Sequence, residues 1–134
     1  MKVCIIGNGL SALTLAKGIV NQNVFVDIFA QNKAKSINQT RTIGISKNNS
    51  DFFNKNIINI EKFLWKLKRI EIFTDNLKNK ELLNFENKND HLFSIIRNHD
   101  LYKVLEKDLS KNKYFKKYIV KKGNLSFINN YDFI

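Results

Sequence analysis

Two glycines near the amino terminus have the spacing that binds a diphosphate. Gly7 and Gly9 follow the apolar run 3–6, and Ala12 completes a G-x-G-x-x-A pattern. Gly7 permits a tight turn, Gly9 lets a pyrophosphate approach the backbone, and a small residue at Ala12 allows close packing of helix on strand. The first N–H groups of the helix then face the anion. The candidate cofactor-binding residues of this turn are Gly7, Asn8, Gly9, Leu10, Ser11 and Ala12.

The flanking segments supply the elements that this chemistry needs. Residues 3–6 predict a strand, residues 11–20 a helix and residues 24–29 a second, mostly apolar strand. Leu13, Ala16 and either Ile19 or Val20 recur at the spacing of a helix face that packs on a sheet. The pattern therefore favours a Rossmann-like β-α-β unit of an α/β fold over an ordinary glycine turn, which remains the alternative.

The sequence offers more than one candidate for the residue that would bind the ribose. An acidic residue about twenty positions past the glycines usually takes this role, and Asp27 is the carboxylate nearest that spacing. Asp27 lies inside the expected strand, whereas Gln31 or Asn32 follows its carboxyl end and could donate hydrogen bonds instead. Asp27 could alternatively pair with a lysine on a neighbouring element.

Short elements are expected in the rest of the chain. A loop is predicted over 31–40 and a short strand or extended turn over 41–46. Two helices are predicted, one over 48–54 with Phe52 and Phe53 buried and one over 60–67. Strands are predicted over 69–74, 82–85 and 92–96, and the first of them is expected to have one solvent-exposed face. A helix over 98–109 carries an apolar stripe made of Leu101, Val104, Leu105 and Leu109. Strand-like segments at the carboxyl end are 118–120, 125–128 and 131–134.

Composition predicts a single folded domain with a basic surface. The 134 residues are 43% hydrophobic and 12% aromatic, with a net charge of +11 and one cysteine, Cys4, expected to be buried. No segment approaches the roughly 20 apolar residues of a membrane span, so we expect a cytoplasmic protein. The lysines are spread among many asparagines, which favours a compositional bias over specific nucleic-acid binding; loose attraction to an anionic membrane fits the same charge. The densest basic stretch, 111–122, is expected at a helix end and an edge strand.

Three segments together resemble one family. The opening residues 3–13, the stretch Arg41-Thr42-Ile43-Gly44-Ile45-Ser46 and the stretch Ile96-Arg97-Asn98-His99-Asp100-Leu101 fall in the same order as three landmarks of FAD-dependent aromatic hydroxylases. The resemblance is closest to the ubiquinone-biosynthesis hydroxylases and more distant to para-hydroxybenzoate hydroxylase. It implies that the first segment holds the FAD pyrophosphate, that Arg41 lies against the cofactor, and that Arg97 or Asn98 lies near the flavin.

The resemblance also implies the chemistry. FAD would be reduced by NAD(P)H and would pass oxygen to an aromatic ring such as a ubiquinone precursor, with peripheral contact at the inner membrane. The cofactor supplies this reactivity, so no catalytic side chain or metal is expected, and His91 and His99 are interpreted as structural or surface residues. A guanidinium also suits a diphosphate by its forked donors, although an exposed loop arginine without a partner is the alternative for Arg41.

Later family landmarks, an Asp-Gly turn and a Gly-Asp segment, have no counterpart among the 134 residues. Tyr131-Asp132-Phe133-Ile134 resembles the start of the strand that precedes them. We therefore expect residues 1–134 to be the amino-terminal part of one FAD-binding domain that is inactive alone. Two other functions remain open: a different NAD- or FAD-binding oxidoreductase, and a basic binding module without enzymatic activity.

Overall fold

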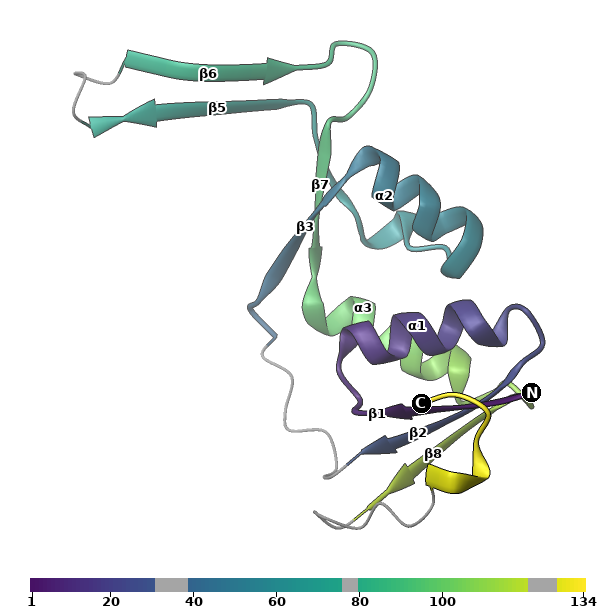
Figure 1. Cartoon of the computed structure of the whole chain (residues 1–134). Coiled ribbons are helices and arrows are strands. Elements are labelled where there is room, and N and C mark those ends of the chain that lie inside the picture. The colour runs from purple at the N-terminus through teal and green to yellow at the C-terminus, as the bar shows by residue number, and fades with distance from the viewer. Residues whose placement is uncertain (31–38, 76–79, 121–127) are drawn as a thin grey trace.

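A parallel three-stranded sheet forms the base of the molecule (Figure 1). The computed structural model describes residues 1–30, 39–75, 80–120 and 128–134. Strands β1 (Lys2–Ile6), β2 (Phe25–Ala30) and β8 (Phe115–Ile119) lie in the order β1-β2-β8. On the free side of β1, Val3 forms a parallel bridge with Phe133, and the Cys4 N–H donates to the Phe133 carbonyl oxygen at 2.8 Å. The last residues of the chain therefore extend this sheet, as the sequence predicts.

Two helices cover one face of the sheet. Helix α1 (Leu10–Val20) joins β1 to β2, and α3 (Asn98–Leu109) leads into β8. Lys17 of α1 and Asp108 of α3 form an ion pair at 2.7 Å. The predicted helix faces are confirmed, because the fully buried side chains include Leu13, Ala16, Val20, Leu105 and Leu109.

The direction of the two helices follows from the parallel strands. Helix α1 starts after the carboxyl end of β1, and α3 must return the chain to the amino end of β8. Both helices therefore begin at the edge of the sheet where β1, β2 and β8 end, and Figure 1 shows these two helix starts above the same side of the sheet. This edge is where ligands bind in open α/β sheets.

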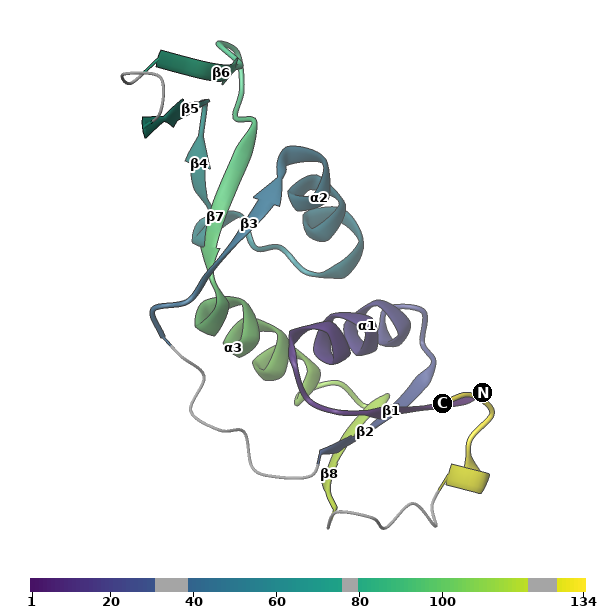
Figure 2. The same ribbon diagram turned by 60° about the vertical axis from the view of Figure 1, so that its left-hand side comes forward.

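A second sheet and a ribbon lie beyond the helices (Figure 2). The sheet is antiparallel in the order β3-β7-β4, made of β3 (Thr42–Ser46), β7 (Phe93–Arg97) and β4 (Trp65–Leu67). The ribbon pairs β5 (Arg69–Thr74) with β6 (Lys80–Glu86) and projects from the rest of the chain. Between β3 and β4 run α2 (Lys47–Phe52), the π-helix η1 (Phe53–Ile57) and the 3₁₀ turn η2 (Glu61–Phe63). A further 3₁₀ turn, η4, spans Ile128–Asn130.

Several local predictions are wrong. Residues 60–67 are not a helix: only the short turn η2 forms, and Trp65 and Leu67 then pair with β7 as strand β4. Phe52 is 57% exposed, because the widened turns of η1 bring Phe53 and Ile57 to the core in its place. In residues 65–67, pairing with β7 outweighs helix propensity. This is a tertiary effect, which the local sequence pattern cannot predict.

The strand predictions near the carboxyl end also need correction. Strand β8 begins at Phe115, three residues before the predicted start, because Phe115 pairs with Val26 in the parallel register. Its position at the edge of the sheet agrees with the edge strand predicted for the basic stretch 111–122. Most of the strand predicted over 125–128 lies outside the described residues, and residue 128 begins η4.

Candidate dinucleotide site

The turn after β1 has the backbone conformation that glycine permits. Gly7 has a φ of +118°, which is strained for any residue with a side chain. Its N–H donates to the carbonyl oxygen of Phe29 at 2.8 Å, so the turn is tied to the end of the neighbouring strand. The predicted role of Gly7 in the turn is confirmed by this geometry.

Gly9 lies beside open space. Its φ of −73° and ψ of 176° are accessible to any residue, and a Cβ at Gly9 would meet no atom within 4 Å. Neither its own backbone geometry nor a neighbouring protein atom requires a glycine here. The free space in front of the backbone is the approach that a diphosphate needs.

The start of α1 is electrostatically available to an anion. Gly9 is the N-cap, no side chain caps the helix, and the first turn contains no acidic residue. The N–H groups of Leu10, Ser11 and Ala12 precede the first intrahelical hydrogen bonds, and the helix dipole adds positive potential at this end. The buried Nδ2 of Asn8 in the same turn has no hydrogen-bond partner in the structure.

The second and third sequence landmarks meet in space. The N–H of Asn98 donates to the carbonyl oxygen of Arg41 at 2.9 Å, and Thr42 lies opposite Arg97 in the antiparallel pair β3-β7. Arg41 is exposed, and the described residues provide no acidic group within ion-pair distance of its guanidinium. The buried Oδ1 of Asn98 has no hydrogen-bond partner. This pair stands at the start of α3, on the edge of the parallel sheet where α1 also begins.

A cavity of about 790 Å³ runs along the outer side of α1. Its lining joins the helix to β3, β7 and η1 through residues that include Leu10, Ser11, Ile43, Ile57, Ile96 and Leu101. Nearly all of these groups are apolar, so the cavity suits a hydrocarbon or a ring and not a diphosphate. The open turn at Gly9 is therefore the candidate anion site, and the cavity is a separate apolar space that begins at the same helix end.

The carboxylate of Asp27 is already engaged. Asp27 is 3% exposed, and its Oδ2 accepts from Lys2 Nζ at 2.8 Å and from the Tyr131 hydroxyl at 2.6 Å. Burial, followed by the hydrogen bond to Asp27, raises the pKa of Tyr131 to about 12, and the hydrogen bond to Asp27 raises the pKa of Lys2. The alternative that Asp27 pairs with a lysine is confirmed, while Gln31 and Asn32 lie outside the described residues.

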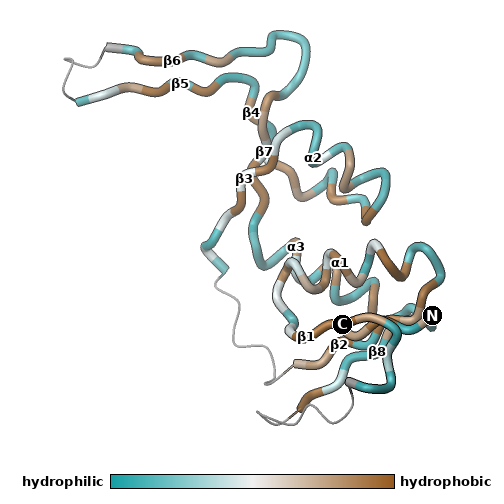
Figure 3. Tube along the Cα trace, viewed as in Figure 1, coloured by the Kyte–Doolittle hydropathy of each residue, from teal (hydrophilic) through white to brown (hydrophobic). Residues whose placement is uncertain are grey.

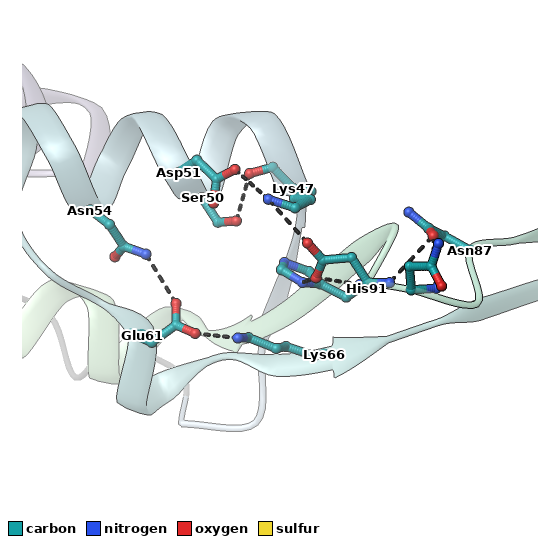
Figure 4. A network of polar contacts seen from close by, with 10 residues as sticks. Lys47, Ser50, Asp51, Asn54, Glu61, Lys66, Asn87 and His91 are labelled. Carbon is teal, nitrogen blue, oxygen red and sulfur yellow. Dashed lines mark hydrogen bonds and ion pairs between the residues drawn. The ribbon is translucent and has the colours of Figure 1, made fainter.

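A polar network holds α2 against the loop before β7 (Figure 4). Asp90 accepts from the backbone N–H of His91 at 2.7 Å and lies 2.8 Å from its Nδ1, and Lys47 reaches both Asp90 and Asp51. The hydrogen bonds from His91 lower the pKa of Asp90 to about 2. His91 is buried in this network, which agrees with its interpretation as a structural residue. The sequence reasoning missed the partners, for which the only signal was the turn-forming run of asparagine and aspartate before His91.

Within the described part of the chain, no helix is both long and apolar enough to cross a bilayer. The same residues contain no group of three or more His, Cys, Asp or Glu side chains arranged to hold a metal ion.

Comparison with known proteins assigns the fold. No protein-family model and no curated protein matches the sequence. Among solved structures, p-nitrophenol 4-monooxygenase PnpA from Pseudomonas putida DLL-E4 aligns over 88% of this chain and 32% of its own, with a TM-score of 0.71 at 10% identity. The flavin-dependent monooxygenase PieE, solved with FAD and substrate, aligns over 89% and 24%, with a TM-score of 0.65 at 11% identity. A geranylgeranyl bacteriochlorophyll reductase-like protein from Thermoplasma acidophilum aligns over 88% and 29%, with a TM-score of 0.67 at 13% identity.

These likenesses establish the fold class. The chain has the mixed α/β fold of the FAD-binding part of flavoprotein monooxygenases, and it spans about a third or less of the length of the structures it matches. The predicted Rossmann-like α/β class is confirmed. The residues present also fit a dinucleotide, because the space beside Gly9, the uncapped helix and the unpartnered Asn8 amide all lie at one turn.

Proposed function

We propose that this chain is the FAD-binding portion of a flavin-dependent monooxygenase that hydroxylates an aromatic ring, with a ubiquinone precursor as the expected substrate. The observation that carries the proposal is the open backbone at Gly9 in front of the uncapped start of α1. Structural likeness to flavoprotein monooxygenases supports the choice of FAD. We expect the portion to be inactive by itself, since the structures it matches are about three times longer or more.

The roles of the residues follow from their chemistry. The N–H groups of Leu10, Ser11 and Ala12 would bind the diphosphate, and the Asn8 amide would donate to a phosphate or ribose oxygen. The fork of donors on Arg41 suits a second contact to the diphosphate or the ribityl chain. Asn98, held beside Arg41, would accept a hydrogen bond through its Oδ1, and Gln31 remains the proposed ribose contact.

FAD would supply the redox chemistry after reduction by NAD(P)H, while the chain supplies binding and orientation. No side chain of residues 1–134 is assigned as an acid, a base or a nucleophile. We place the protein in the cytoplasm, with peripheral contact at a membrane. Specific binding of nucleic acid forms no part of the proposal.

Titration with three ligands tests the proposal. FAD, riboflavin and NAD⁺ are added to the purified protein, and binding is followed by calorimetry and, for the flavins, by quenching of flavin fluorescence. We expect FAD to bind at least about tenfold more tightly than riboflavin, which lacks the diphosphate that charge-assisted hydrogen bonds recognise. Equal affinity for FAD and riboflavin, or no affinity for either, would contradict the assignment of the Gly9 turn.

The NAD⁺ titration distinguishes the proposed FAD-binding function from a second candidate, a different dinucleotide oxidoreductase. The shared fold of a reductase-like protein shows that this architecture is not restricted to monooxygenases. Binding of NAD⁺ in preference to FAD would favour a different dinucleotide oxidoreductase.

A further inference from the structure

The glycine turn contains the only Asn-Gly pair of the chain, Asn8-Gly9. The apolar strand β1 runs into this turn and α1 leaves it (Figure 3). Asparagine before glycine is the pair most prone to loss of the side-chain amide, because glycine has no side chain that hinders attack by its backbone nitrogen on the asparagine Cγ. The fold around the turn therefore decides whether Asn8 keeps its amide.

Neither of the two reacting groups is held by a hydrogen bond. The buried Nδ2 of Asn8 has no partner in the structure, and among the described residues none accepts a hydrogen bond from the Gly9 N–H. A buried amide that has lost water and gained no protein partner is not stabilised by folding. A Cβ at Gly9 would meet no atom within 4 Å, so the turn has room for a ring that joins the two residues.

The start of α1 favours the reaction electrostatically. Gly9 is the N-cap, and the first turn of the helix contains no acidic residue. The positive potential at this helix end stabilises negative charge on the Gly9 nitrogen as it loses its proton, and on the oxygen of the tetrahedral intermediate. The same potential stabilises the carboxylate that the reaction leaves at position 8. The features that make the turn a candidate anion site thus also favour conversion of Asn8.

We propose that Asn8 is a site of spontaneous deamidation and that its conversion blocks the binding of a diphosphate at this turn. The Gly9 nitrogen forms a bond to Asn8 Cγ, the bond from Cγ to Nδ2 breaks, and the amide proton of Gly9 leaves with the ammonia. Water then opens the succinimide ring, which gives an aspartyl or an isoaspartyl residue at position 8. One water is consumed and one ammonia is released, and no oxidant or reductant takes part.

The product carries a negative charge at the turn to which the proposed function assigns the diphosphate. A carboxylate at position 8 competes for the N–H groups at the start of α1 and repels the phosphates. The isoaspartyl form also adds one carbon to the backbone of the turn. This consequence rests on the proposed FAD site, whereas the deamidation does not. Both reacting groups belong to adjacent residues, so the proposal requires no free surface elsewhere on the molecule.

Peptide mapping by mass spectrometry tests the modification. The purified chain is incubated at pH 7.5 and at pH 9, and the amide-to-acid mass change is followed at Asn8 and at Asn49. Asn49 is exposed on α2 and precedes Ser50, whose side chain hinders the attack. We expect Asn8 to convert at least about tenfold faster than Asn49, and Gly9→Ala to slow the conversion of Asn8 by a similar factor. The reaction should be faster at pH 9, since the nucleophile is the deprotonated backbone nitrogen.

Titration with FAD tests the consequence. The fresh protein is compared with its converted fraction and with Asn8→Asp, and Asn49→Asp is the matched control that adds the same charge on α2. We expect the converted fraction and Asn8→Asp to bind FAD at least about tenfold more weakly, and the control to differ less than about twofold. FAD present at ten times its Kd should slow the conversion of Asn8 about tenfold, because the bound diphosphate occupies the space in which the ring forms.

Each contradicting result points to a different part of the account. Retention of the Asn8 amide in the folded protein, with conversion in the urea-unfolded chain, would show that the fold protects the residue and would overturn the proposal. Conversion without any loss of FAD affinity would overturn the block of diphosphate binding. A fresh protein that binds no FAD would instead contradict the proposed function, while the mass of the peptide that contains Asn8 still decides whether the residue deamidates.

Discussion

The backbone N–H of Asn98 donates to the carbonyl oxygen of Arg41 at 2.9 Å, which joins the entry of β3 to the first residue of α3. This hydrogen bond places two sequence landmarks side by side at the edge of the sheet where α1 also begins. The Arg41 side chain is exposed, and no carboxylate of the described residues lies within ion-pair distance of its guanidinium. Within that part of the chain, the guanidinium could contact a ligand without breaking an ion pair.

Arg41→Gln should weaken FAD binding about tenfold and leave the free energy of unfolding unchanged within about 0.5 kcal/mol. Loss of charge-assisted hydrogen bonds accounts for the first effect and exposure of the side chain for the second. Calorimetric titration and urea unfolding measure the two quantities. Arg69→Gln, on the distant ribbon, is the matched control, and an equal change of FAD affinity in the control would remove Arg41 from the site.

Gly44→Ala should destabilise the antiparallel sheet. A Cβ at Gly44 would lie 2.4 Å from two atoms of the Phe93 ring, so the ring must move. We expect a loss of about 1–3 kcal/mol in the free energy of unfolding, as for other overpacked sites. The double variant Gly44→Ala with Phe93→Leu should recover part of this loss, and no recovery would show that the clash is not the cause.

Gly7→Ala should destabilise the chain through the backbone. A φ of +118° is strained for alanine although a Cβ there meets nothing within 4 Å. We expect a loss of about 1–3 kcal/mol in the free energy of unfolding. An unchanged unfolding midpoint in urea would mean that the turn adopts another conformation in solution.

Stability should fall between pH 10 and pH 12 through the cluster of Lys2, Asp27 and Tyr131. The folded state raises the pKa of Tyr131 from 10.0 to about 12, so the neutral phenol is favoured by folding. The resulting stabilisation is complete below pH 10 and is lost as the pH rises towards 12. The raised pKa of Lys2 acts in the same direction above its ordinary value of 10.5.

Tyr131→Phe tests this dependence. Urea unfolding of both proteins at pH 9 and pH 11.5 should show a smaller loss for the variant. Absorbance at 295 nm should show that the variant lacks a tyrosine ionisation near pH 12 that the wild-type protein has. Equal losses in the two proteins would assign the pH dependence to other groups.

Local pattern was enough to predict the elements around the glycine turn. Residues 3–29 contain an apolar strand, a helix with a buried stripe and a second strand, and each of these signals is complete within a short window. The same holds for Leu101, Leu105 and Leu109 on the buried face of α3. The Gly7 turn also follows from its own residues, since only glycine accepts its φ without strain.

Contacts between distant residues decided the remaining features. Residues 65–67 form a strand because β7 offers them hydrogen bonds. Asp27 pairs with Lys2 and accepts a hydrogen bond from Tyr131, 104 positions away. The proximity of Arg41 to Asn98 depends on the antiparallel register of β3 and β7. None of these contacts can be predicted from the residue pattern of a single segment.

Titration of FAD into the wild-type protein and Gly9→Ala tests the central claim most directly. The backbone of Gly9 accepts alanine and its Cβ meets no protein atom within 4 Å, so the added methyl group occupies only the space assigned to the diphosphate. We predict at least about tenfold weaker FAD binding, with a loss of no more than about 1 kcal/mol in the free energy of unfolding from the poorer N-cap. Equal FAD affinity in the two proteins would contradict a diphosphate site at this turn.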